Sequence, residues 1–304
     1  MITPPPLRPG DRIGIVTPAG RISGGALENA VDHFRSWGLE VTVSPGAYSV
    51  CNQFGGTDMQ RTAGLQDMLD DETVRAVICS RGGYGCVRII DKLDFGNFLR
   101  NPKWIVGYSD ITVLHSHVNR VCGVETLHGP MAAELSPEKK SPVSQRSMEL
   151  LRESLFGTMP AYYMKNHPLS RMGRASGVLA GGNLSVLYSI LGSASAPDTG
   201  GSILFIEEVG EYLYHLDRIM MAMKRSGLLG NIGGLVVGGL TGMKDNDAPF
   251  GKTAEEIIAE AVEDYDFPVM FGFPAGHQPE NHPLIMGREV TLSVEDKTGS
   301  ITFR

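Results

Sequence analysis

The stretch Trp104-Ile105-Val106-Gly107-Tyr108-Ser109-Asp110-Ile111-Thr112 joins an apolar, strand-like run to the start of a helical pattern. Outward from it, another helical pattern opens with a capping box at Thr57–Gln60, and further strand-like runs occupy residues 11–17, 39–43 and 74–79. Strands that alternate with helices form mainly parallel sheets that are covered on both faces. We therefore expect an α/β fold built around such a sheet.

The second half of the chain has a different pattern. Between residues 141 and 172 the periodicity weakens while polar, proline and basic residues accumulate, which indicates a linker. Beyond it strand-like segments predominate, and the chain closes with a predicted hairpin of residues 289–292 and 300–303. We expect an N-terminal domain of residues 1–140, a linker of residues 141–172 and a β-rich C-terminal domain of residues 173–304.

Ser109 is a candidate nucleophile because of where it stands. A serine on a strand-to-helix turn has its hydroxyl held clear of the sheet, and the N–H groups at the helix start can stabilise an oxyanion. The segment is similar to a nucleophile elbow, although Ile111 stands where the G-x-S-x-G pattern has its last glycine. The alternative interpretation is that Ser109 only caps the helix.

A glycine-rich turn, Arg81-Gly82-Gly83-Tyr84-Gly85, directly follows the strand-like run of residues 74–79. Glycines allow backbone amides to approach a ligand closely. The match to the dinucleotide pattern G-x-G-x-x-G fails because the third glycine is missing. The turn therefore indicates the wall of a binding site, or an oxyanion donor, rather than a pyrophosphate site.

A serine nucleophile needs a base, and an imidazole needs an acidic partner. His277 follows a predicted strand of residues 268–273 on a short loop, whereas His33, His115 and His117 lie in helical stretches. Glu207 and Glu208 end the strand-like run of residues 201–206, and a solvated turn is the alternative explanation for this pair.

Composition argues against several classes of protein. The formal net charge of −7 gives no basic footprint for nucleic acid, and no apolar run approaches the roughly 20 residues that span a bilayer. The N-terminus shows no signal-peptide pattern, and no histidine or cysteine cluster has metal-ligand spacing. We expect a cytoplasmic protein with no metal, no cofactor, no membrane contact and no nucleic-acid partner.

Taken in order along the chain, these motifs and two others resemble the LD-carboxypeptidases, which include the muramoyltetrapeptide carboxypeptidases and the microcin C immunity peptidases. The ordered set is Arg81-Gly82-Gly83-Tyr84-Gly85, Gly107-Tyr108-Ser109-Asp110, His128-Gly129-Pro130-Met131, Gly181-Gly182-Asn183-Leu184, Phe205-Ile206-Glu207-Glu208 and Gly276-His277. Each motif is modest alone, but the set covers essentially the whole chain. The resemblance implies a Rossmann-like N-terminal domain joined to a β-rich C-terminal domain, with the active site across their junction.

The resemblance also implies a role for individual residues. Ser109 would be the nucleophile, Glu207 the acid and His277 the base, with the backbone amides of Gly83 and Asp110 as oxyanion donors. The implied reaction is a serine carboxypeptidase step that releases the terminal D-alanine of the murein tetrapeptide during cell-wall recycling. A guanidinium suits the free carboxylate of such a substrate. The candidate substrate-binding residues are Arg81, Tyr84, Arg88 and Arg218, and a backbone nest is an equal alternative.

Two other functions remain open at this level. The first is hydrolysis of peptidyl or aminoacyl nucleotides, as by the microcin C immunity peptidases, which resemble longer chains with a tryptophan-bearing loop near the domain junction. The only tryptophans here are Trp37 and Trp104, which favours the murein peptidase. The second is a non-enzymatic ligand-binding protein, which the combined serine, glutamate and histidine argue against. The family resemblance also implies a homodimer.

Overall fold

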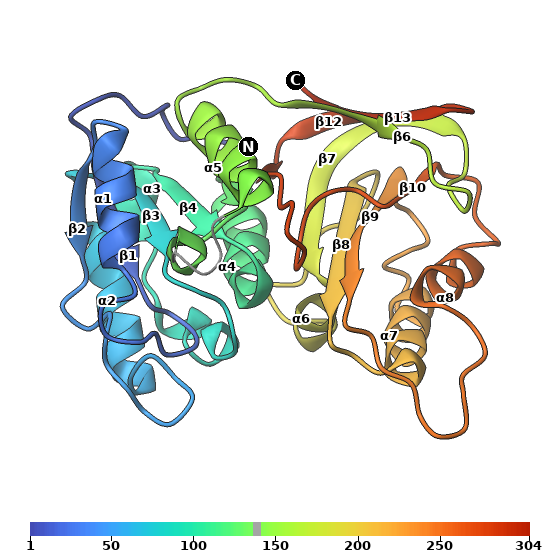
Figure 1. Ribbon diagram of the computed structural model, residues 1–304, viewed down its shortest axis with the longest axis horizontal. Coiled ribbons are helices and arrows are strands. Elements are labelled where there is room, and N and C mark those ends of the chain that lie inside the picture. Colours follow the sequence, from blue (N-terminus) through green and yellow to red (C-terminus); the bar gives the residue numbers. More distant parts are fainter. Residues whose placement is uncertain (136–140) are drawn as a thin grey trace.

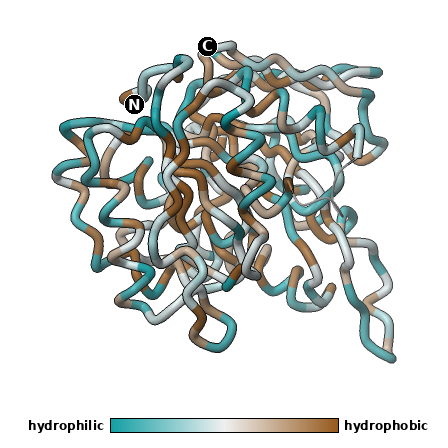
Figure 2. The backbone as a smooth tube through the Cα atoms, turned by 60° about the vertical axis from the view of Figure 1, so that its left-hand side comes forward, coloured by the Kyte–Doolittle hydropathy of each residue, from teal (hydrophilic) through white to brown (hydrophobic). Residues whose placement is uncertain are grey.

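The structure is a computed structural model that describes residues 1–135 and 141–304, and it consists of two β-sheets with helices packed on them (Figure 1). The N-terminal half builds most of a six-stranded sheet, and the C-terminal half builds a seven-stranded sheet. Hydrophobic segments run through the middle of the molecule, whereas the outer loops are mostly hydrophilic (Figure 2). No helix among the described residues is both long enough and apolar enough to span a bilayer.

The first sheet has the strand order β11-β5-β4-β3-β1-β2. Neighbours from β2 to β5 run parallel, and β11 pairs with β5 in the antiparallel sense. The strands are β1 (Arg12–Val16), β2 (Glu40–Val43), β3 (Val74–Cys79), β4 (Trp104–Gly107), β5 (Thr126–His128) and β11 (Leu284–Met286). The helices of this half are α1 (Glu28–Ser36), α2 (Asp58–Asp70), α3 (Gly96–Arg100) and α4 (Thr112–His117).

The parallel part of this sheet has the doubly wound order 2-1-3-4-5. In such a sheet the direction of winding reverses between β1 and β3, and the loops that leave the carboxyl ends of these two strands diverge. The divergence opens a crevice at that edge, where ligands of doubly wound proteins bind. The glycine-rich turn after β3 and the serine turn after β4 both lie at this edge.

The second sheet has the order β10-β9-β8-β7-β12-β13-β6. Strand β7 joins its two parts: residues 173–178 pair antiparallel with β12, and residues 179–183 pair parallel with β8. The strands are β6 (Ala161–Lys165), β7 (Gly173–Asn183), β8 (Ile203–Val209), β9 (Gly234–Thr241), β10 (Val269–Phe271), β12 (Glu289–Val294) and β13 (Thr298–Phe303). The helices are α5 (Pro142–Leu155), α6 (Leu184–Ser189), α7 (Leu213–Arg225) and α8 (Ala254–Ala261).

Several local predictions are confirmed. The run at residues 74–79 is β3, the capping box at Thr57–Gln60 forms at the start of α2, and the C-terminal hairpin is β12 with β13. The α/β fold with a mainly parallel N-terminal sheet and a second, β-rich half is also confirmed. The strand, the capping box and the hairpin depend on residues close together in the chain, so a local pattern is enough to find them.

The segment expected to be a linker carries regular structure. Residues 142–155 form α5, which Ser141 caps and which buries Met148, Leu151 and Leu155. Residues 161–165 form β6, the edge strand of the second sheet. Farther along the chain, β11 lies in the expected C-terminal domain but pairs within the first sheet. The sequence pattern missed α5 because its apolar residues form only one narrow stripe among polar ones. The domain boundaries themselves stay a prediction.

Candidate active site

Ser109 lies directly beyond the end of β4, on a single 3-10 turn (Ser109–Ile111) that leads into α4. Its backbone φ is 65°, in the left-handed region that side chains other than glycine rarely adopt. His115 Nε2 donates a hydrogen bond of 2.8 Å to the carbonyl oxygen of Gly107, and burial lowers the pKa of His115 to about 4. A neutral buried imidazole therefore holds the strand end from which the strained serine projects.

The glycine turn after β3 presses against this serine. A Cβ added to Gly82 would lie 2.7 Å from Ser109 Cβ and 2.8 Å from Ser109 Oγ, so no larger residue fits without displacing the hydroxyl. The same virtual atom would lie 3.4 Å from the backbone nitrogen of Asp110. The two segments that carry the predicted oxyanion donors, Gly83 and Asp110, are therefore in contact.

Glu207 and His277 come together from β8 and from the loop that follows β10. Glu207 is completely buried, and its Oε2 lies 2.7 Å from His277 Nδ1 and accepts a second hydrogen bond from the His277 backbone N–H at 3.1 Å. Burial lowers the pKa of His277, but the hydrogen bond and charge of Glu207 outweigh it, so this pKa lies above its ordinary value. The contact fixes the ring and leaves Nε2 for another partner.

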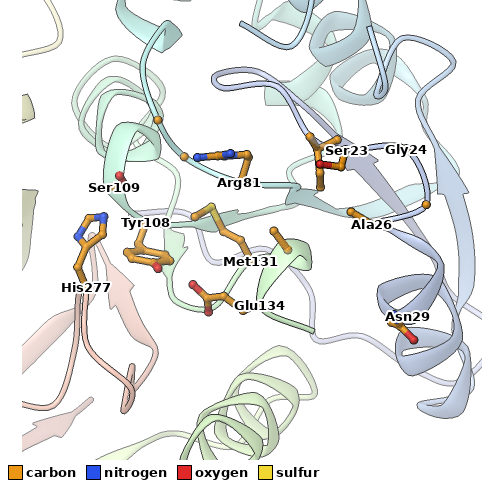
Figure 3. Close-up of a pocket in the computed structure, with 15 residues that line it drawn as sticks. Ser23, Gly24, Ala26, Asn29, Arg81, Tyr108, Ser109, Met131, Glu134 and His277 are labelled. Carbon is orange, nitrogen blue, oxygen red and sulfur yellow. The ribbon is translucent and has the colours of Figure 1, made fainter. Parts of the chain in front are cut away.

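Ser109 and His277 line one cavity of about 690 Å³. Its walls include Gly82 and Gly83 after β3 and residues 22–26 after β1, so it occupies the crevice where the sheet winding reverses. In Figure 3 the imidazole of His277 points toward Ser109. A serine and an imidazole thus line one cavity, with a buried carboxylate hydrogen-bonded to the imidazole, and such a set of groups can carry out acyl transfer.

Two residues that the sequence argument did not single out also shape this cavity. The Tyr108 ring packs against the His277 imidazole with centroids 4.9 Å apart, and Glu134 lines the cavity beside it (Figure 3). Burial and the neighbouring Glu134 carboxylate raise the pKa of Tyr108, so its hydroxyl stays protonated. The place of Tyr108 next to Ser109 is the only hint in the sequence that its side chain lines the cavity, and nothing in the sequence marks Glu134.

Known proteins resemble this chain over nearly its whole length. The model of the LD-carboxypeptidase N-terminal domain matches residues 13–129, and that of the LD-carboxypeptidase C-terminal domain matches residues 176–292. A putative carboxypeptidase of Synechocystis is 34% identical, with 99% of this chain and 97% of that protein covered. The chain belongs to the LD-carboxypeptidase family. The predicted family membership, and with it the assignment as a serine-type peptidase, is confirmed.

Further relatives and solved structures resemble this LD-carboxypeptidase. A probable murein peptide carboxypeptidase of Bacillus subtilis is 32% identical over 98% of this chain and 93% of its own length. The crystal structure of muramoyltetrapeptide carboxypeptidase from Oxalobacter formigenes has a TM-score of 0.86 at 26% identity and covers 96% of this chain and 98% of its own. The microcin C7 self immunity protein MccF, solved with aspartyl sulfamoyl adenosine, has a TM-score of 0.87 at 20% identity, with 98% of each chain covered, and shares the fold.

Of the four candidate substrate-binding residues of this LD-carboxypeptidase, the cavity contains only Arg81. The guanidinium of Arg88 donates two hydrogen bonds to Asp58, at 3.0 and 2.9 Å, so its charge is compensated outside the cavity. Arg218 lies on α7 with its guanidinium 5.2 Å from the ring centre of Tyr214. Tyr84 is 48% exposed and packs against Phe54 rather than against the serine.

The second glutamate of this LD-carboxypeptidase points away from the histidine. Glu208 accepts hydrogen bonds from Asn183 Nδ2 at 3.1 Å and from Ser185 N at 2.7 Å, and a third from the Ser185 hydroxyl. Its side chain therefore ties the end of β8 to the start of α6. Burial raises the pKa of Glu208, and these donors act in the opposite direction. Because consecutive side chains on a strand alternate between faces, only Glu207 reaches His277.

No group of three or more histidine, cysteine, aspartate or glutamate side chains suited to a metal ion occurs within the described part of the chain.

Proposed function

We propose that Ser109, His277 and Glu207 form the catalytic triad of a serine LD-carboxypeptidase that releases the terminal D-alanine from the murein tetrapeptide. The observation that carries this proposal is the 2.7 Å contact between Glu207 and His277 beside Ser109 on one cavity. The names of the Bacillus subtilis relative and of the Pseudomonas aeruginosa murein tetrapeptide carboxypeptidase support the substrate; the latter is 29% identical over 92% of both chains.

In the proposed mechanism, His277 Nε2 takes the proton of the Ser109 hydroxyl as Oγ attacks the scissile carbonyl carbon. The resulting oxyanion accepts hydrogen bonds from the Gly83 and Asp110 backbone N–H groups. His277 then protonates the departing amine, and D-alanine leaves an acyl-enzyme ester. Water attacks that ester, its proton passes through His277, and Ser109 is regenerated. Glu207 holds the imidazole tautomer and stabilises its cationic form.

A carboxypeptidase must also recognise the free carboxylate at the end of its substrate. Arg81 lines the same cavity as Ser109, and its guanidinium extends toward the serine in Figure 3. Its Nη1 donates a hydrogen bond of 3.2 Å to the carbonyl oxygen of Arg21, which orients the group and leaves further donors. We assign Arg81 the binding of the terminal carboxylate.

Hydrolysis of peptidyl nucleotides is less well supported. Such a substrate needs an aromatic face on which the base stacks. The side chains of Trp37 and Trp104 are 8% and 3% exposed, and Trp104 Nε1 donates to the carbonyl oxygen of Pro5. Neither indole of the chain therefore offers a free face.

The proposed setting is the cytoplasm, where the enzyme would act as a homodimer on peptides returned from wall turnover. The homodimer rests on the family resemblance. Light scattering coupled to size-exclusion chromatography measures the oligomeric state directly, and a monomer at micromolar concentration would contradict the homodimer.

The test of the function is incubation with purified murein tetrapeptide and pentapeptide, followed by mass spectrometry of the products. D-alanine should appear from the tetrapeptide, whose last bond follows an L-centre, and not from the pentapeptide, whose last bond joins two D-centres. Because Ser109 attacks from one fixed side, the carbonyl oxygen reaches the oxyanion donors for only one configuration of the flanking α-carbons. Ser109→Ala should lower kcat by several orders of magnitude. Pentapeptide cleavage, or a preference for a peptidyl adenylate, would overturn the assignment of the murein tetrapeptide as substrate but would not contradict the catalytic triad.

A further inference from the structure

Three loops meet at the carboxyl edge of the first sheet: the loop after β1, the glycine turn after β3 and the serine turn after β4. Two buried charged side chains, Asp110 and Arg61, lie among them with relative exposures of 3% and 2%. A buried charge is costly unless it is paired and hydrogen-bonded. The partners of these two residues therefore matter.

Asp110 spans two of the loops. It belongs to the serine turn, yet its Oδ2 accepts a hydrogen bond of 2.8 Å from the backbone N–H of Cys86, at the end of the glycine turn. Burial raises the pKa of Asp110, and the hydrogen bond from Cys86 acts in the opposite direction. Asp110 thus holds the glycine turn onto the segment that carries the nucleophile.

Arg61, from α2, reaches the same glycine turn from the other side. Its Nη1 donates to the carbonyl oxygen of Gly85 at 2.9 Å and to that of Pro18, in the loop after β1, at 2.6 Å. Its Nη2 is paired with Asp58, which also pairs with Arg88. Both hydrogen bonds from Arg61 Nη1 therefore go to backbone carbonyls, one in the glycine turn and one in the loop after β1.

The carbonyl of Gly85 and the N–H of Cys86 belong to one peptide unit. In a trans peptide these two groups point in opposite directions, and the structure has no cis peptide bond among the described residues. The negative Asp110 therefore faces the positive end of this peptide dipole, and the positive Arg61 faces its negative end. Both contacts stabilise the same orientation of the same peptide unit.

Such an anchor is needed because the turn has little rigidity of its own. Gly83 and Gly85 have φ values of 116° and 139°, which L-residues with side chains rarely adopt, and glycine visits many other conformations at similar cost. One further link holds the turn, a hydrogen bond of 3.1 Å from Gly20 N to the carbonyl oxygen of Gly82. The Gly83 amide lies between the two anchored ends.

We propose that the Asp110 carboxylate is a positioning residue of the oxyanion hole, which holds the Gly85–Cys86 peptide unit against Arg61 and thereby fixes the Gly83 amide relative to the Asp110 amide. This inference rests on the proposed function of Ser109. Asp110 then acts twice: its backbone N–H is one oxyanion donor, and its side chain sets the distance to the other. Substrate binding itself does not depend on this clamp, the grip of Asp110 and Arg61 on the Gly85–Cys86 peptide unit, because the oxyanion forms only as the serine attacks.

The test is the isosteric variant Asp110→Asn. The amide keeps the shape and can still accept from Cys86, but it lacks the charge that opposes Arg61. We expect kcat for the tetrapeptide to fall roughly ten- to a hundredfold, less than the 10²- to 10³-fold loss typical of removing an oxyanion donor outright, with KM unchanged. Affinity for a tetrahedral peptide phosphinate should fall by the same factor as kcat/KM. Affinity of the tetrapeptide for Ser109→Ala and for Ser109→Ala/Asp110→Asn, measured by calorimetry, should be equal.

The matched control is Asp71→Asn. Asp71 Oδ1 accepts a hydrogen bond of 2.8 Å from the backbone N–H of Thr73, in the turn at the opposite end of β3. This variant should keep the wild-type kcat and phosphinate affinity. If Asp110→Asn fails to fold, Arg61→Lys approaches the same peptide unit from the other side and should lower kcat with KM unchanged.

The outcomes separate this inference from the function on which it rests. Unchanged kcat and phosphinate affinity in Asp110→Asn, with Ser109 still labelled by a fluorophosphonate, would overturn the inference alone. Equal losses of phosphinate and tetrapeptide affinity would also overturn it, because they would mean that Asp110 only supports the fold. Failure of the fluorophosphonate to label wild-type Ser109 would instead overturn the proposed nucleophile.

Discussion

Glu207 Oε2 and His277 Nδ1 lie 2.7 Å apart, although 70 residues separate them along the chain. The glutamate comes from the buried part of β8, residues 203–208, in the second sheet, and the histidine from the loop after β10. The other carboxylate oxygen, Glu207 Oε1, is buried and has no hydrogen-bond partner within the described residues. The hydrogen bonds with His277 are therefore the ones that compensate the burial of the Glu207 carboxylate.

The two neighbouring glutamates should respond differently to loss of charge. Glu207→Gln should lower kcat by about 10³- to 10⁴-fold, because an amide favours the wrong imidazole tautomer. Glu208→Gln should keep most activity but lower the free energy of unfolding by about 1–3 kcal/mol, since one carboxylate oxygen is replaced by a donor facing other donors. Steady-state kinetics and denaturant titration of both variants measure the two effects. The opposite assignment of effects would mean that Glu208, not Glu207, is the partner of the base.

The pH dependence should report the pKa of His277. The base must be neutral to accept the serine proton, so kcat/KM should fall as the pH drops through this pKa, which lies above the ordinary histidine value of about 6.5. Glu207→Gln removes the two largest interactions that raise this pKa, the hydrogen bond of Glu207 and its charge, whereas burial, which lowers the pKa, remains together with the smaller effects of Glu208 and Glu134. The acid limb of the profile should therefore move to lower pH while the maximum falls. An acid limb that stays in place in the variant would argue against His277 as the titrating base.

A single methyl group at position 82 should disable the nucleophile. In Gly82→Ala the new Cβ would lie 2.8 Å from Ser109 Oγ, so the hydroxyl must shift. Displacement of a reacting group by about 1 Å typically costs about 10²-fold in rate. Gly46→Ala is the control, because its new Cβ would meet only Ser49 Oγ, at 3.8 Å. Measurement of kcat and of fluorophosphonate labelling should show a loss in the first variant only, and equal rates would contradict the close packing of Gly82 on Ser109.

Arg81 should decide the preference for a free carboxylate. Arg81→Met should lower kcat/KM for the tetrapeptide about 10- to 100-fold, which corresponds to roughly 1.5–3 kcal/mol for hydrogen bonds to a charged group. For a peptide that ends in an amide, wild type and variant should be alike. Arg218→Met should behave as wild type on both substrates, because that side chain lies on Tyr214 outside the cavity. Loss of activity in Arg218→Met but not in Arg81→Met would mean that the substrate carboxylate binds at α7.

Much of the local structure was readable from the sequence because it depends on residues close together in the chain. The strand at residues 74–79 is a continuous apolar run, and the capping box at Thr57–Gln60 satisfies its own backbone donors. The segment at residues 141–172 was misread because α5 and β6 each bury only one side, and their partners lie elsewhere in the chain. The buried residues of α5 have helical spacing, but two of them are serines, Ser147 and Ser154, which weaken the apolar pattern.

For the candidate site, the sequence by itself determined which residue types are present and in what order: a serine after a strand, paired glutamates at a strand end and a histidine on a loop. The family resemblance implied Glu207 rather than Glu208 as the acid, but only the tertiary structure gives the physical reason, because β8 fixes which face each side chain occupies and Glu207 alone of the two meets His277. The tertiary structure likewise placed Arg81 in the cavity and paired Arg88 with Asp58. The clamp of Asp110 and Arg61 has no sequence signature at all, because both side chains act on backbone groups, which are the same in every residue.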